Sequence, residues 1–155
     1  MKVRLTLFVL LCSVILLSAV SDQSAKADKV IGTYYVYKHE TKSESRVQIY
    51  KAANGTYEGK IIWLKNPNYA DGTPKMDKNN PDPKLRTVKT IGLVLVKGFK
   101  YDEKADEWID GKIYDPDDGK TYSCKLKFET DTKLRVRGYI GIPALGKTMI
   151  WEKKS

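Results

Sequence analysis

The chain has 155 residues, of which 28 are basic and 19 acidic, so its formal net charge is +9, and this length fits one ordinary domain. It contains a single histidine, His39, which excludes any site built on two or three histidines, such as a His-rich zinc centre. A Ser-His-Asp triad would have to use this one residue.

The N-terminus has the layout of a secretory signal peptide. Lys2 and Arg4 precede an apolar run from Leu5 to Leu17, and small polar residues follow. The run is about 13 residues long, shorter than the roughly 20 needed to span a bilayer. We therefore expect cleavage, export to the periplasm or the medium, and a mature chain without a transmembrane segment.

Two cleavage sites satisfy the small-x-small pattern, one ending at Ser21 and the other at Ala27. We favour the second, which makes residues 1–27 the signal peptide and residues 28–155 a single mature domain of net charge +7. Cys124 is then the one cysteine left. An exported chain with one thiol has no internal disulfide, so its stability must come from a hydrophobic core.

Beyond residue 30 the chain consists of period-two runs rich in Val, Ile, Tyr and Thr, separated by Gly, Asn, Asp and Pro. Such runs predict short strands. Asn54-Gly55 predicts a hairpin, since both residues tolerate positive φ. The continuous apolar run from Ile91 to Val96 predicts a strand buried on both faces. The predicted strands cover residues 30–38, 46–51, 56–64, 91–101, 108–114, 121–129, 133–139 and 147–152.

One long segment, residues 65–87, contains four prolines and cannot hold a regular strand. The other connections are short, which is typical of hairpins. About eight strands linked in this way predict an all-β fold, a single antiparallel up-and-down β-barrel, because closure removes exposed edges. A two-sheet β-sandwich is the alternative. An eight-stranded barrel is filled by side chains or holds one small ligand.

Six ordered motifs resemble those of a family of small exported bacterial proteins called domain of unknown function 2147. The resemblance implies a bacterial, exported, lipocalin-like or calycin-like barrel, and it carries no catalytic residues. Gly32-Thr33-Tyr34 is also similar to the Gly-x-Trp opening of lipocalins, whose ring plugs the closed end of the barrel. The six motifs are Tyr57-Glu58-Gly59-Lys60-Ile61, Asp77-Lys78-Asn79-Asn80-Pro81-Asp82, Leu85-Arg86, Gly111-Lys112-Ile113-Tyr114-Asp115-Pro116, Asp118-Gly119-Lys120-Thr121-Tyr122 and Arg137-Gly138-Tyr139-Ile140-Gly141.

Polar residues crowd the long loop. Oxygen ligands of this kind suit calcium, but Pro81 interrupts the ligand spacing, so we predict no metal site and no cofactor. Asx side chains that bond backbone amides, with Arg86 paired to an aspartate, are the favoured interpretation. As candidate ligand-binding residues we take Asp77, Asn79, Asn80, Asp82, Arg86, Tyr114, Arg137 and Tyr139.

Three further groups have structural interpretations. We read Asp115, Asp117 and Asp118 as turn residues rather than catalytic carboxylates. Cys124 should face inward with Tyr122, Leu126 and Phe128, and a buried thiol is inert. Three tryptophans on predicted strands suit the core. The basic C-terminal region could attract anionic envelope molecules; it consists of Lys133, Arg135, Arg137, Lys147, Lys153 and Lys154, with Lys125 and Lys127 nearby.

Three functions stay open. The favoured one is a binding module for a small apolar or amphipathic molecule. The second is an enzyme in which Asp77, Asp82 and Arg86 act on an envelope polysaccharide or lipid. The third is an interaction protein with a filled core. Export and the lack of a nucleic-acid signature argue against a nucleic-acid partner, and the sequence does not determine the oligomeric state.

Overall fold

Alternation of apolar and polar side chains builds each strand with one buried and one exposed face. In β7 (Lys133–Tyr139), Leu134 and Val136 are fully buried, and Arg135 and Arg137 between them face outward. Side chains alternate across a strand, so one such pattern supplies both a core face and a solvent face. The computed structural model describes residues 24–154.

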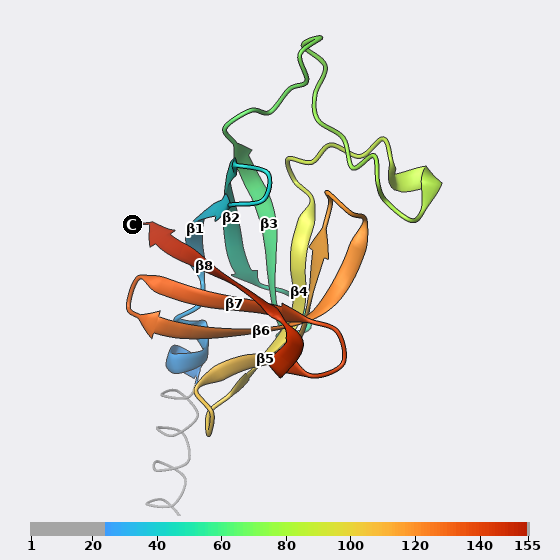
Figure 1. The fold of residues 1–155 in the computed structure, drawn as a ribbon. Helices are drawn as coiled ribbons and strands as arrows, with labels where there is room; N and C mark the ends of the chain where they lie inside the picture. Colours follow the sequence, from blue (N-terminus) through green and yellow to red (C-terminus); the bar gives the residue numbers. More distant parts are fainter. Residues whose placement is uncertain (1–23, 155) are drawn as a thin grey trace, which may run out of the picture.

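Eight strands close into one antiparallel barrel, in which each strand pairs with its neighbours in sequence and β1 also pairs with β8 (Figure 1). The predicted barrel is confirmed. The sandwich alternative is wrong, because a sandwich would lack the pairing between the first and last strands. The strands are β1 (Gly32–Lys38), β2 (Ser43–Lys51), β3 (Tyr57–Leu64), β4 (Val94–Asp102), β5 (Glu107–Asp115), β6 (Lys120–Thr130), β7 and β8 (Lys147–Lys154).

One local prediction was wrong, and one was confirmed with a different turn geometry: the hairpin predicted at Asn54-Gly55 joins β2 to β3. The run from Ile91 to Val96 is not a strand buried on both faces: Ile91 is 44% exposed, and the strand β4 starts at Val94. Gly92 bends the chain there with a φ of 96°. At the β2–β3 hairpin only Gly55 takes a positive φ, and Asn54 instead accepts a hydrogen bond from the Thr56 amide through its side chain.

The two ends of the barrel differ. One end of the barrel, which we call the mouth, holds the C-terminal ends of β1, β3, β5 and β7. The long loop over residues 65–93 projects beyond the strands there (Figure 1). The opposite, closed end carries the short hairpin turns and residues 24–31. This end is lined by aromatic rings: Trp108 contacts both Tyr101 and Phe128, with ring centroids 5.0 and 5.7 Å away.

Close packing fills the barrel beneath these rings. The ring of Phe99 lies directly against the backbone of Gly111, where a Cβ would overlap it. Tyr34, at the position of the lipocalin-like opening motif, is fully buried and donates its hydroxyl to the Val30 carbonyl at 2.8 Å. Cys124 and Leu126 face inward as predicted, and burial raises the pKa of the Cys124 thiol to about 12.

The segment before β1 covers the closed end. Trp108 donates its indole N–H to the Ala27 carbonyl at 3.0 Å, and Tyr57 donates its hydroxyl to Asp28 at 2.6 Å. The predicted apolar run and the Ser21 cleavage site lie outside the described residues. Within residues 24–154, no helix has the length and apolar character to cross a membrane.

Candidate functional site

The long loop is fixed to the outer face of β5 by a buried carboxylate. Asp77 is fully buried; it accepts the Tyr114 hydroxyl at 2.7 Å and the Asn80 amide at 2.7 Å. Burial and the bond to Asp77 raise the pKa of Tyr114, so its hydroxyl stays a donor at neutral pH. Three predicted site residues therefore come together, and they hold one another.

A second attachment joins the loop to the β5–β6 turn. Asn79 donates to the carbonyls of Pro116 and Asp117 at 3.1 and 2.9 Å. Its own carbonyl lies so close to Gly119 that a side chain there would clash, and Gly119 has a φ of 71°. Glycine is thus required at this position by both conformation and space.

The remaining predicted loop residues shape its tip. Asn80 accepts the Asp82 amide through its side chain, and Asp82 accepts the Lys84 amide, both as predicted for Asx turns. The predicted pairing of Arg86 with an aspartate is wrong: its Nε donates to the Asn80 carbonyl at 2.8 Å. The loop is a self-bonded unit rather than a flexible connection.

An ion pair spans the mouth of the barrel. Lys38 at the end of β1 reaches Asp115 on the opposite strand β5 at 2.8 Å, and Asp117 in the adjoining turn at 2.5 Å. Burial disfavours its charge, but these hydrogen bonds outweigh burial and raise the pKa of Lys38. The aspartates sit in a tight turn, as predicted, and in addition they close the mouth.

Arg137 and Tyr139 lie on the outer face of β7, away from the long loop's attachment. Arg137 donates to the Pro143 and Ala144 carbonyls at 2.6 and 3.0 Å and to Thr148 at 2.7 Å. All these partners belong to the β7–β8 connection or the start of β8. The Arg137 guanidinium is occupied in shaping this connection, and Tyr139 is half-buried beside it.

Most of the basic C-terminal region is neutralised locally. Lys125 and Lys127 both pair with Glu107, at 2.9 and 3.3 Å. Arg135 pairs with Glu129 at 3.7 Å. Paired cations of this kind offer less attraction to an external anion than unpaired ones.

A hollow of about 260 Å³ lies between the long loop and the outside of the barrel. Its wall is mainly apolar, with Leu85 and Leu93 from the loop and Leu95 from β4. Lys97 and Lys112 add two ammonium groups, and neither has an acidic partner among the described residues. We call it the groove; its lining residues are Asn80, Pro81, Leu85, Leu93, Val94, Leu95, Lys97, Lys112, Tyr114 and Thr121.

The two lysines of the groove face each other across neighbouring strands. Lys97 and Lys112 are register partners in the β4–β5 pair, and like charges in this position destabilise a sheet. Lys112 donates to Ser123 at 3.0 Å, which satisfies one of its N–H groups without cancelling its charge. A bound anion would relieve this repulsion.

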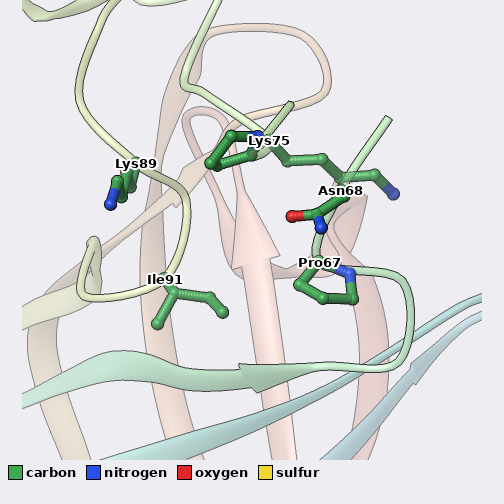
Figure 2. A pocket seen from close by; sticks show the side chains of 6 residues that line it. Pro67, Asn68, Lys75, Lys89 and Ile91 are labelled. Carbon is green, nitrogen blue, oxygen red and sulfur yellow. The ribbon is translucent and has the colours of Figure 1, made fainter. Parts of the chain in front are cut away.

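A second hollow, also of about 260 Å³, lies within the long loop itself. Figure 2 shows Ile91 and Pro67 on its walls, with Lys75 and Lys89 on either side. Neither hollow is inside the barrel. The interior holds one feature of note: the indole N–H of Trp151 is buried and lacks a hydrogen-bond partner among the described residues.

Sequence reasoning found two residues of the groove, Asn80 and Tyr114, and missed the rest. Lys97 and Lys112 alternate with buried residues on their strands, so each reads as an ordinary solvent-facing lysine. Their cross-strand register, which follows from strand pairing, is what brings the two charges together. Within residues 24–154, no cluster of His, Cys, Asp or Glu is arranged to hold a metal ion.

A closed eight-stranded barrel whose first strand carries a buried aromatic residue, here Tyr34, defines a lipocalin-like protein. The structure is similar to protein HP1028 of the human pathogen Helicobacter pylori, which belongs to the lipocalin family, with a TM-score of 0.68 and 28% identity over 81% of this chain and 83% of that chain. Residues 32–153 match the model of a family described as uncharacterized protein conserved in bacteria (DUF2147). The chain belongs to this family. No curated protein matches it.

Proposed function

We propose that this protein is exported and binds a small amphipathic anion, and that the binding site is the groove on the outside of the barrel. The observation that carries the proposal is the pairing of an apolar wall with two lysines that lack acidic partners within residues 24–154. Ligand sites combine apolar surface with a few polar groups in this way. The ligand class is an alkyl chain that ends in a carboxylate or phosphate.

The size of the groove limits what it holds. At about 260 Å³ it is slightly smaller than the roughly 300–1,000 Å³ typical of ligand pockets, so it suits a short chain or one end of a longer one. The Lys97 and Lys112 ammonium groups would bind the anionic end. Leu85, Leu93 and Leu95 would contact the chain.

The geometry favours binding over hydrolysis. The enzyme hypothesis needs two carboxylates that face one cleft, but Asp77 is buried with both oxygens bonded. Asp82 caps a turn. Neither lines the groove, so the groove supplies charge and apolar contact without an acid and base pair.

Calorimetric titration of the purified mature protein with decanoate tests the proposal. We expect saturable binding, and the double variant Lys97→Met/Lys112→Met should bind about tenfold more weakly, since each partly exposed charge pair contributes on the order of 0.2–1 kcal/mol. Uncharged decanol should bind less well than decanoate. The matched control is Lys104→Met/Lys133→Met, which removes two exposed lysines at the closed end.

Failure would be equally clear. If the wild type does not bind decanoate or decyl phosphate, or if the control variant loses as much affinity as the groove variant, the groove is not the site. Export is tested separately by fractionating a bacterial host that expresses the full chain. Recovery of the protein in the cytoplasm alone, with residues 1–27 retained, would contradict it.

A further inference from the structure

The long loop exposes an unbroken stretch of chain that carries large apolar side chains. Every residue from 81 to 89 is exposed, including Leu85 at 45% and Val88 at 40%, and Ile91 follows at 44%. Apolar surface concentrated on one projecting segment marks an interaction site more often than scattered single residues do. The loop projects beyond the strand ends (Figure 1).

The same loop is strongly basic. Residues 65–93 include six basic and three acidic residues, and one of the acids, Asp77, is buried and fully bonded. The ammonium groups of Lys75, Lys84 and Lys89 have no hydrogen-bond or ion-pair partner in the described part of the chain. This differs from Lys125 and Lys127 on the barrel wall, which share Glu107.

Backbone hydrogen bonds hold these charges and apolar side chains on one unit. The Thr90 amide donates to the Lys75 carbonyl and the Asp77 amide to the Val88 carbonyl, both at 2.9 Å. One hollow is consequently lined by Lys75, Lys89 and Ile91. The two lysines lie on opposite sides of it (Figure 2). Val88 does not line this hollow, but it is exposed and precedes Lys89 in the chain. We call Lys75, Val88, Lys89 and Ile91 the loop patch.

We propose that the loop patch docks the protein onto the surface of a bilayer that contains anionic phospholipid. Aliphatic side chains beside unpaired lysines match the boundary where lipid phosphates lie just above acyl chains. The attraction depends on charge complementarity, since the patch offers cations that nothing else in the described chain neutralises. Docking does not depend on whether the groove is occupied.

Vesicle sedimentation tests this proposal with the mature protein purified after export, its N-terminus established by mass spectrometry so that no signal peptide contributes. We expect binding to vesicles of phosphatidylcholine with phosphatidylglycerol, weaker binding to phosphatidylcholine alone, and loss of binding as salt is raised. Lys75→Glu/Lys89→Glu should weaken binding by about thirtyfold or more. Val88→Ser/Ile91→Ser should weaken it by about tenfold.

Two control pairs make the result specific. Lys104→Glu/Lys133→Glu reverses charges at the closed end, and Ile140→Ser/Leu145→Ser removes the most exposed apolar side chains of the β7–β8 connection, 72% and 80% exposed. Both should bind vesicles as the wild type does. The groove variant Lys97→Met/Lys112→Met should keep most of its vesicle binding, so that failure of the groove and failure of docking are distinguishable.

The proposal is overturned if the wild type does not bind anionic vesicles, or binds both kinds of vesicle equally. It is also overturned if a control pair loses binding as fully as the patch variants. Self-association that the patch variants abolish, without vesicle binding, would assign the loop patch to a second copy of the chain instead. Circular dichroism of each variant confirms that it is folded.

Discussion

The closed end and the long loop are stabilised by different interactions. At the closed end, Trp108, Phe99 and Tyr34 are fully buried and pack ring against ring or ring against backbone. In the loop, Asp77 is the one fully buried side chain among residues 65–93. Hydrogen bonds therefore stabilise the loop, whereas apolar packing stabilises the closed end.

The closed end contributes mainly to the stability of the fold, whereas the loop presents side chains that could bind other molecules. A close-packed core tolerates little change, because each lost contact leaves a cavity. A loop held by a few polar bonds at its base leaves its apolar and basic side chains exposed to other molecules. In our proposals the barrel is the scaffold, and the proposed groove and loop patch lie where the loop meets the barrel or projects beyond it.

The largest expected effect is at the closed end. Trp108→Ala should lower the free energy of unfolding by about 3–5 kcal/mol, the usual cost of removing a large buried aromatic side chain. Trp63→Ala is the matched control, since Trp63 is 37% exposed on the outer face, where Arg46 stacks on it, and it should cost about 1 kcal/mol or less. Urea unfolding measures both. Equal losses would contradict the assignment of Trp108 to the core.

A smaller and local effect is expected from Asp77→Ala. The change leaves the Tyr114 hydroxyl and the Asn80 amide without their acceptor, which costs about 1–3 kcal/mol, and it should release the loop from β5. Trypsin should then cut at Lys84, Arg86 or Lys89 much faster than in the wild type, while the barrel stays folded. Unchanged proteolysis would show that Asp77 does not hold the loop.

The smallest expected effect is a pH dependence of stability that arises from Glu107 at the closed end. Burial of Glu107 would raise its pKa, but its ion pairs with Lys125 and Lys127 outweigh burial and hold the pKa below the usual value of 4.5. A lowered folded pKa stabilises the protein above the unfolded pKa, and this contribution is lost as pH falls through the folded value.

Glu107→Gln should therefore be less stable than the wild type at neutral pH by about 1 kcal/mol or less, and the difference should shrink in acid below about pH 4. Urea unfolding at a series of pH values measures this difference. A gap that stays constant as the pH falls from neutral into acid would show that the charge of Glu107 contributes nothing.

The sequence predicted the barrel well because its strands carry a local signal. Leu134 and Val136 alternate with Arg135 and Arg137, and that period alone assigns their faces. The run at Ile91 misled because apolar composition does not distinguish a buried strand from an exposed loop. Gly92 bends the chain there, and the exposed side chains of this run belong to the loop.

The sequence pointed to residues of the proposed groove only where they stand in local motifs. Asn80 and Tyr114 stand in motifs that resemble the family, but Lys97 and Lys112 become a pair only through the register of β4 with β5. The bond from Arg86 to a carbonyl rather than an aspartate depends on the loop's own path. Such non-local geometry follows from folding and has no signature in a single sequence.

The central claim is that the ligand binds outside the barrel. An amide nitrogen–proton correlation spectrum, recorded while decanoate is added, tests it directly. We predict shifts at Leu93, Leu95, Lys97 and Lys112, with the indole signal of Trp151 unchanged. A large shift of the Trp151 indole N–H, whose buried group lacks a partner within the described residues, with none in the groove, would place the ligand inside the barrel and contradict the account.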